Sequence, residues 1–429
     1  MKKEKIMFVV MPYEGEVLDR VTAKFYKNKA VKYMPLGVLS IAATIPVDRY
    51  DVQVLDAASL GLSLDETIEA IENWAPDVLG LSVVTYRAWA MTEILKRTSA
   101  PCKVVGGPHA TKNYRYILQQ GAHAVFVDDG EVIFPEWLDS GRPPGVYFGG
   151  QVDLNALPLP ARHLLDIDIY RIEKNEDLLF DVGSLRLPMF SSKGCPYSCT
   201  YCDVQQKTFN MKSAERCVEE FKELIRLGAT SIHILDDAFN VNRARVSDIS
   251  RALIAENINI DWSARGTVEV REDVIADLAD AGCRRLHVGI ESLDDDILAT
   301  FKKASRYKHI EQFCKLCDKY GIDILGYFIV GAPGETTEYR RTLPGRIRDL
   351  GIKLPYFNLL SPLAETPYYE QLLREGRFEY DVWQSFCRQP VRDFIIPEIR
   401  SVEEEDELRQ MIDRYVEHFK RDDMPVFVS

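Results

Sequence analysis

Three cysteines stand within eight residues, in the pattern Cys195-x-x-x-Cys199-x-x-Cys202. Thiolates select zinc, copper(I) or iron–sulfur clusters, and structural zinc sites normally close with four cysteine or histidine ligands. The next cysteine, Cys217, lies fifteen residues further on in a predicted amphipathic helix, and no histidine occurs between residues 164 and 232. Three thiolates in one loop therefore predict a four-iron cluster with one iron left open to another ligand. The alternatives are a zinc loop completed by a distant ligand and ordinary buried thiols.

Polar motifs follow four successive predicted strands after the cysteine motif. In a barrel of parallel strands, such residues gather at the C-terminal ends, where ligands bind. The motifs are LDDAFN, WSAR, HVGIES and FIVGAPGET, and they contain Asp236, Asp237, Arg265, Glu291, Ser292, Gly331, Pro333, Gly334 and Glu335. Alone, an aspartate pair is typical of a cap or turn, and Gly-x-Pro-Gly-Glu is typical of a loop before a helix. Their regular placement favours one shared ligand site.

The cysteine motif and the strand-end motifs together resemble those of the radical S-adenosylmethionine (SAM) superfamily. The resemblance implies a 4Fe–4S cluster held by Cys195, Cys199 and Cys202, with the amino and carboxylate groups of SAM on the fourth iron. One-electron reduction would cleave SAM to methionine and a 5′-deoxyadenosyl radical. That radical would abstract hydrogen from a substrate.

The resemblance also implies which residues contact SAM. Asp236 and Asp237 match the acidic motif for the SAM amino group, and Arg265 has the bidentate fork suited to a carboxylate. Glu291 and Ser292 match the ribose and methionine contacts. The adenine ring is implied to lie against Tyr201 and the segment Gly331, Pro333, Gly334 and Glu335.

Residues 188–375 alternate short apolar runs with amphipathic stretches, which predicts a series of βα units. We expect strands at 187–194, 231–237, 258–265, 284–291, 323–331 and 355–360. We expect helices at 214–228, 245–257, 272–282, 309–321 and 337–351. Six units favour a partial (β/α)6, TIM-like barrel over a second open sheet, but the pattern alone leaves both open. Residues 376–429 are acidic and predict a small helical C-terminal tail.

The first 150 residues show the same alternation and predict a separate domain. Strands are expected at 6–12, 52–57, 78–84, 102–108 and 124–127, and helices at 35–45, 64–74, 88–98, 113–121 and 131–138. The strands are nearly continuous apolar runs, as in parallel sheets buried on both faces. The fold class is therefore α/β, with a doubly wound, Rossmann-like N-terminal domain. Residues 151–187, punctuated by Pro158 and Pro160, are predicted to be a linker.

The segments YMPLGVLSIAATI, DVLGLSVVTYR, VVGGPHAT and VFVDDGE resemble the cobalamin-binding domain that is fused to one large class of radical SAM proteins. Ligands of such sheets bind outside the carboxyl ends of the strands. The implied cobalamin contacts are Ser82, Thr85, Gly106, Gly107 and Glu131. Two features depart from the family pattern: no D-x-H-x-x-G motif occurs, and Asp128-Asp129 replaces a glycine-rich sequence. The alternative is a scaffold domain without the cofactor.

Composition and charge limit the remaining classes of protein. A net charge of −13 over 429 residues argues against a nucleic-acid-binding or membrane-binding surface. No apolar stretch approaches the length of a membrane span, and the N-terminal MKKEKIMFVVMP lacks a signal-peptide core, so a cytoplasmic protein is expected. The nine cysteines, an odd number, favour reduced thiols or metal ligation over disulfides.

The resemblance implies an enzyme that methylates an unactivated carbon of a small metabolite or natural-product intermediate, with cobalamin passing the methyl group from SAM. Without cobalamin, the same motifs imply a radical dehydratase, epimerase or cyclase. A non-catalytic scaffold that carries a cluster is a third hypothesis, against which the full set of SAM motifs argues. The chemistry requires an electron donor such as flavodoxin or ferredoxin. No membrane or nucleic-acid partner is expected.

Overall fold

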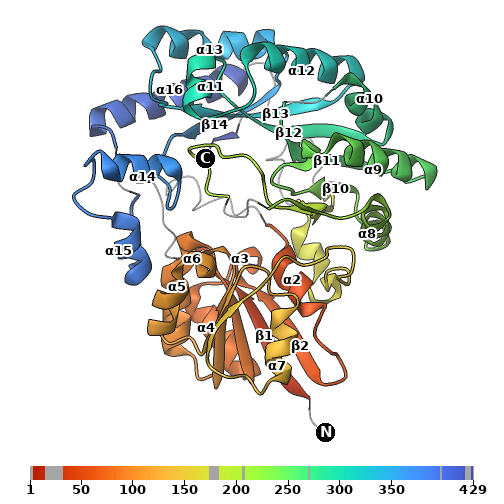
Figure 1. Ribbon diagram of the computed structural model, residues 1–429, viewed down its shortest axis with the longest axis vertical. Helices are drawn as coiled ribbons and strands as arrows, with labels where there is room; N and C mark the ends of the chain where they lie inside the picture. Colours follow the sequence, from red (N-terminus) through yellow and green to blue (C-terminus); the bar gives the residue numbers. More distant parts are fainter. Residues whose placement is uncertain are drawn as a thin grey trace. The chain divides into compact units, whose positions relative to one another are not determined.

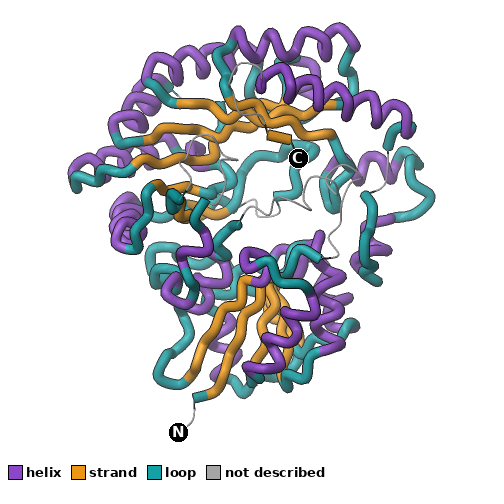
Figure 2. The backbone as a smooth tube through the Cα atoms, turned by 180° about the vertical axis from the view of Figure 1, so that it is seen from behind, coloured by secondary structure: helices purple, strands orange, loops and turns teal. Residues whose placement is uncertain are grey.

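The structure is a computed structural model, and it describes residues 3–14, 32–172, 183–204, 208–268, 271–396, 399–420 and 427–428. The chain divides into two compact units. The first is Met1–Tyr170 with Glu379–Ile396, and the second is Arg171–Phe378 with Pro397–Ser429. These units differ from the predicted segments, because residues 151–170 join the first unit and the tail from residue 376 is divided. Each unit is built on one large parallel sheet (Figure 2).

The first unit contains a six-stranded parallel sheet in the order β2-β1-β3-β4-β5-β6. Its strands are β1 (Glu4–Val10), β2 (Tyr50–Asp56), β3 (Val78–Ser82), β4 (Cys102–Gly106), β5 (Ala124–Val127) and β6 (Gly145–Phe148). The strand order reverses between β1 and β3, which confirms the doubly wound topology. The prediction of five strands missed β6, because four residues at a sheet edge, none of them fully buried, carry too little pattern to be recognised.

Helices cover both faces of this sheet (Figure 1). They are α2 (Leu36–Ala42), α3 (Ala57–Leu60), α4 (Leu64–Trp74), α5 (Ala88–Arg97), α6 (Pro108–Gln119) and α7 (Ile133–Asp139), with short 3-10 turns at Thr85–Arg87, Arg162–Leu164 and Ile167–Tyr170. Helices α4, α5 and α6 pack their apolar residues on one face in a common core with β1, β3, β4 and β5. On the other face Phe134 of α7 packs against Phe8 and Phe126, with ring centroids 5.4 and 5.1 Å apart. Proline at the first helical position starts α6 five residues earlier than predicted.

A helix from the C-terminal part of the chain, α15 (Val382–Arg388), also belongs to the first unit. The side chain of Gln120 at the end of α6 donates a hydrogen bond to the carbonyl oxygen of Cys387, 3.2 Å away. Trp383 packs edge-on against Tyr86, with ring centroids 6.3 Å apart, and both Trp383 and Phe386 are buried. The first unit is therefore assembled from two separate stretches of sequence.

The second unit contains a seven-stranded parallel sheet in the order β15-β14-β13-β12-β11-β10-β7. The strands are β7 (Arg186–Met189), β10 (Ser231–Ile234), β11 (Asp261–Gly266), β12 (Cys283–Glu291), β13 (Asp323–Val330), β14 (Leu354–Leu359) and β15 (Phe427–Val428). Each strand pairs with the next one along the chain, as in the wall of a (β/α) barrel and unlike the reversed order of the first sheet. The sheet ends at β7 and β15, so the predicted partial barrel is confirmed and the second open sheet is wrong.

Most helices of the second unit lie along one face of this sheet (Figure 1). They are α8 (Ala214–Arg226), α9 (Arg243–Ala255), α10 (Glu272–Asp280), α11 (Asp295–Thr300), α12 (Tyr307–Tyr320), α13 (Thr337–Asp349), α14 (Pro367–Arg374) and α16 (Val402–Lys420), with a 3-10 turn at Phe239–Val241. Phe357 of β14 packs against Tyr415 and Phe419 of α16, with ring centroids 5.1 and 6.3 Å apart. The tail is helical as predicted, but it also adds β15 beside β14. In the described ranges, no helix is both long enough and apolar enough to cross a membrane.

Candidate functional site

The site residues predicted in the second unit lie where its parallel strands end. Arg265 is the penultimate residue of β11, and Glu291 is the last residue of β12. Asp236 and Asp237 follow β10 by two and three residues, and Gly331 follows β13 directly. Because parallel strands end at the same edge of a sheet, these groups share the edge at which barrels bind their ligands.

The three cysteines lie on a loop between two short strands, β8 (Ser192–Lys193) and β9 (Asn210–Met211), which pair antiparallel at its stem. Their thiols are partly exposed, whereas the other six cysteines are buried. Three accessible thiolates are a soft donor set that fits an iron–sulfur cluster. In the part of the chain that the structure describes, no three His, Cys, Asp or Glu side chains are grouped closely enough to hold a metal ion.

The buried carboxylate of Asp236 holds the segment that leads into the cysteine loop. It accepts hydrogen bonds from the backbone N–H groups of Ser191, at 2.6 Å, and Ser192, at 3.0 Å. It also accepts hydrogen bonds from the hydroxyl groups of the same two serines, at 2.5 and 2.6 Å. Asp236 thus braces the loop stem, whereas Asp237 is exposed.

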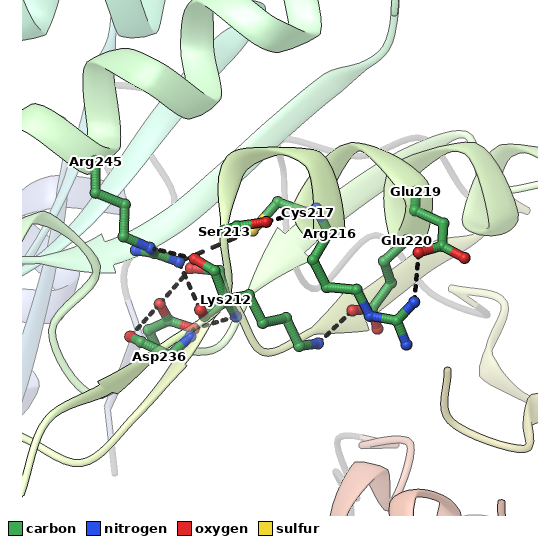
Figure 3. A network of polar contacts seen from close by, with 10 residues as sticks. Lys212, Ser213, Arg216, Cys217, Glu219, Glu220, Asp236 and Arg245 are labelled. Carbon is green, nitrogen blue, oxygen red and sulfur yellow. Dashed lines mark hydrogen bonds and ion pairs between the residues drawn. The ribbon is translucent and has the colours of Figure 1, made fainter. Parts of the chain in front are cut away.

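Arg245 and Lys212 fasten the two sides of the same stem (Figure 3). The guanidinium of Arg245 donates to the carbonyl oxygens of Lys212, at 2.8 Å, and Ser191, at 2.5 Å. The backbone N–H of Lys212 donates to the same Ser191 oxygen at 2.9 Å. The Lys212 ammonium pairs with the fully buried Glu220. Removing one partner of such buried charge pairs is costly, because the other charge is left without compensation.

Tyr201 and Glu291 contact each other beside the cysteine loop. The Tyr201 hydroxyl donates to Glu291 Oε1 at 2.7 Å. Burial, and then the Glu291 carboxylate, raise the pKa of Tyr201, so the hydroxyl stays protonated as a donor. Glu291 Oε1 also lies 3.4 Å from the ammonium of Lys303, a residue that the motif analysis missed. Ser292, which is buried, shares a 2.8 Å hydrogen bond with the hydroxyl of Tyr339.

The loop that begins at Gly331 is held by hydrogen bonds to Glu335 within it and from Arg400 in the C-terminal tail. Glu335 accepts hydrogen bonds from the Gly331 N–H, at 2.9 Å, and from Arg340 Nε, at 3.0 Å. Burial raises the pKa of Glu335 despite these donors. Arg400, which precedes α16, donates to the carbonyl oxygens of Gly331 and Leu360. Glu335 therefore shapes the loop, and the loop residues Pro333 and Gly334 are exposed.

Two histidines lie next to each other in the second sheet. The rings of His233 and His287 have centroids 4.6 Å apart, and His233 Nδ1 lies 2.6 Å from the hydroxyl of Ser263. His287 pairs in register with Arg265, so the two side chains share a face of the sheet. Burial lowers the pKa of both histidines well below the ordinary value, and nearby arginines add to the effect. Both imidazoles are therefore neutral at pH 7.

The predicted contacts in the first unit gather beside the point where its strand order reverses. Ser82 ends β3 and pairs in register with Gly106, which ends β4. Gly107 follows with φ +92°, and a Cβ there would lie 2.9 Å from the backbone N and O of Val83. Glu131 lies in the next loop, after β5, and is buried. Four of the five predicted residues, all except Glu131, thus belong to two adjacent strand ends.

Thr85 is linked to the buried His109, which begins the first turn of α6. His109 Nδ1 lies 3.2 Å from the Thr85 hydroxyl, and the His109 N–H donates to the Val83 carbonyl at 3.0 Å. Burial lowers the pKa of His109 to about 4. The imidazole is therefore neutral and fully enclosed, in keeping with the absence of a D-x-H-x-x-G motif.

Two family models match the chain. The model described as radical SAM superfamily matches residues 189–343, which contain the cysteine loop and β10 to β13, and the model described as B12 binding domain matches residues 28–138. The chain belongs to the radical SAM superfamily and carries a B12-binding domain. The cysteine and strand-end motifs thus identify the radical SAM domain, and the paired strand ends of β3 and β4 lie in the B12-binding domain.

Known proteins are similar to this chain along most of its length. An uncharacterized methyltransferase of Pyrococcus horikoshii is 27% identical over 416 residues, covering 90% of this radical SAM protein and 87% of the relative. The hopanoid C-2 methylase of Rhodopseudomonas palustris is 26% identical over 388 residues, covering 85% and 68%. A solved radical SAM methyltransferase from Kitasatospora setae, with cobalamin and a [4Fe-4S] cluster bound, has a TM-score of 0.65 at 18% identity over 87% of this chain and 75% of its own. That likeness shows a common fold.

Substituting Asp236→Asn should lower the free energy of unfolding by about 1–3 kcal/mol. The amide NH2 group would face N–H and O–H groups that now donate to a carboxylate oxygen, so these donors would lose an acceptor. Urea unfolding of the full chain, followed by circular dichroism, measures this. Asp237→Asn is the matched control, and we expect a change within about 0.5 kcal/mol there because the side chain is exposed. Equal losses in the two variants would contradict the bracing role of Asp236.

Substituting Gly107→Ala should lower the stability of the B12-binding domain by about 1–3 kcal/mol, because an alanine at this φ is strained and its Cβ would press on the Val83 backbone. Gly37→Ala in α2 is the control. A Cβ there has no atom within 4 Å, so alanine should be neutral or stabilising by up to about 1 kcal/mol. Thermal unfolding of both variants measures the difference, and a Gly107→Ala variant as stable as the parent would refute the requirement for glycine.

Proposed function

We propose that the protein is a cobalamin-dependent radical SAM methyltransferase that transfers a methyl group to a carbon atom of a small molecule. The observation that carries this proposal is the presence of a B12-binding domain and a radical SAM domain in one chain. The names of the relatives support it, since they include a methyltransferase and a hopanoid C-2 methylase. A donor such as flavodoxin or ferredoxin would supply the electron.

Different residues near the strand ends of the second unit would hold different parts of the cofactors. When bound, the cluster supplies the electron that cleaves SAM, and cobalamin supplies the methyl carrier. Cys195, Cys199 and Cys202 would hold the cluster on their partly exposed loop. Asp236 is occupied by four donors, so Asp237 is the carboxylate of the pair that is left for the SAM amino group. Arg265, at the end of β11, would bind the SAM carboxylate.

The remaining SAM contacts also follow from where side chains are already engaged. The backbone of the exposed Pro333 and Gly334 would lie against adenine, whereas Glu335 is directed back to its own loop. Glu291 and Ser292 would contribute to the ribose and methionine contacts from positions fixed by Tyr201 and Tyr339.

In the B12-binding domain, the strand-end residues would hold cobalamin by small side chains and backbone. Ser82, Thr85, Gly106 and Gly107 have small side chains or none, so they would allow close approach of a large flat ligand. Because His109 is fully buried, we infer that the cobalt takes no imidazole from this loop. Glu131, which is buried, would contact the same ligand from the loop after β5.

A second candidate function is ring formation without methyl transfer. An anaerobic magnesium-protoporphyrin IX monomethyl ester cyclase of Rubrivivax gelatinosus is 22% identical over 373 residues, covering 80% of this chain. The two reactions differ in what becomes of SAM. Methylation consumes one SAM for the methyl group and one for the radical, whereas cyclisation needs only the radical.

The Cys199→Ala variant tests the cluster ligands. After anaerobic reconstitution with iron and sulfide, we expect it to lose the broad cluster absorbance and at least 100-fold of the 5′-deoxyadenosine formed from SAM with reductant, roughly the cost of an essential catalytic group. Cys314→Ala is the control, because Cys314 is buried on α12 and burial raises its pKa to about 12. A Cys199→Ala variant that keeps the cluster would contradict the assigned ligands.

Product analysis distinguishes methylation from cyclisation. The full chain is reconstituted with and without hydroxocobalamin and incubated with SAM and reductant. We expect cobalamin to be retained after desalting and S-adenosylhomocysteine to form only in the cobalamin-loaded sample. If the desalted chain retains no cobalamin, and SAM yields 5′-deoxyadenosine and methionine without S-adenosylhomocysteine, the methyltransferase is overturned and the cyclase is favoured.

A further inference from the structure

The segment after α11 lies directly against the turn between the second and third cysteines. The Thr200 N–H donates to the carbonyl of Phe301 at 3.1 Å, and the Thr200 hydroxyl donates to the carbonyl of Thr300 at 3.3 Å. The ring of Tyr201 meets that of Phe301 edge-on, with centroids 5.0 Å apart. Two stretches that are a hundred residues apart in sequence are thus joined beside Cys199 and Cys202.

Lys303 lies two residues after Phe301 and places a positive charge beside the cysteine loop. Its side chain is only 14% exposed, and its ammonium lies 3.4 Å from Glu291 Oε1, a carboxylate that is itself 8% exposed. The same oxygen accepts the Tyr201 hydroxyl at 2.7 Å. A lysine is rarely enclosed to this extent unless it is paired. Tyr201 and Glu291 therefore fix the ammonium next to the cysteine loop.

The charge on Lys303 is maintained by its neighbours. Burial lowers its pKa, but the paired Glu291 carboxylate raises it above the ordinary value. The side chain is therefore a permanent cation at neutral pH.

The backbone is adapted to this arrangement in two places. Glu291 has φ +66°, in the left-handed region that residues other than glycine seldom adopt, and it lies at a register shift of β12. A Cβ on residue 289 would overlap Glu291 Oε1 and lie 3.2 Å from Lys303 Nζ, so Gly289 is needed for the pair to form. Strain of this kind is retained mainly at functional sites.

We propose that Lys303 is a positioning residue that fixes a positive charge beside the cluster and makes its one-electron reduction more favourable. Reduction adds one negative charge to the cluster, and a nearby cation in a poorly solvated place stabilises the more negative state. Net charge near an iron–sulfur cluster is one of the factors that set its reduction potential. Glu291 opposes the effect in part and holds the ammonium in place. The inference rests on the proposed function, because it requires a cluster on the three cysteines.

The test is a redox titration of the full chain, reconstituted anaerobically without SAM, cobalamin or substrate, and followed by the EPR signal of the reduced cluster. Lys303→Met removes the charge and keeps the length of the side chain. We expect its equilibrium constant for reduction to fall about tenfold, a shift of about 59 mV to more negative potential for one electron. Lys303→Arg should stay near the parent. Lys302→Met is the matched control, since Lys302 is exposed and adjacent in sequence.

Glu291→Gln separates an electrostatic role from a structural one. Removing the negative charge should shift the potential in the opposite direction, to less negative values, whereas mere loosening of the loop would move both variants the same way. A Lys303→Met potential equal to that of the parent, or shifts of the same sign in both variants, would overturn the proposal. If Lys303→Met binds no cluster, the sign of the Glu291→Gln shift decides. A parent chain that takes up no cluster would refute the proposed function itself.

Discussion

The radical SAM domain depends on buried hydrogen bonds that hold a polar loop onto an apolar sheet. The cysteine loop gains little from hydrophobic packing, because its three cysteines are partly exposed. Its stem is fixed by the Asp236 carboxylate on one side and by the Arg245 guanidinium on the other, and both groups are almost completely enclosed. In such a setting an unmatched donor or charge is far more costly than it would be in water. The loop geometry is thus tied to the integrity of the barrel core.

The chemistry of the site can be predicted from the sequence to the extent that it resides in residue types and spacing. The sequence predicts Cys195, Cys199 and Cys202 as cluster ligands, because three thiols lie in one short loop. The strand-end motifs follow because apolar runs mark the strands, and parallel strands end together. The structure confirms the predicted order of elements, including the doubly wound sheet and the partial barrel.

The details that the sequence could not predict depend on contacts between distant residues. Asp236 and Asp237 are adjacent and chemically alike, and only the fold shows that Ser191 and Ser192 occupy the first and leave the second exposed. Arg400 reaches Gly331 from 69 residues away. Lys302 and Lys303 differ in burial although no local pattern distinguishes them. The strands β6 and β15 have four and two residues, too few to show a period.

The discontinuity of the first unit has a consequence for the order in which the protein is made and folded. Helix α15 covers part of α6, yet the ribosome synthesises it only after all strands of the second sheet except β15. The B12-binding domain therefore cannot reach its final packing while it is the newest part of the chain. Until Trp383 and Phe386 arrive, the surface that they bury on Tyr86 and α6 stays open to solvent or to a chaperone. Maturation of the two domains is in this way coupled in time as well as in function.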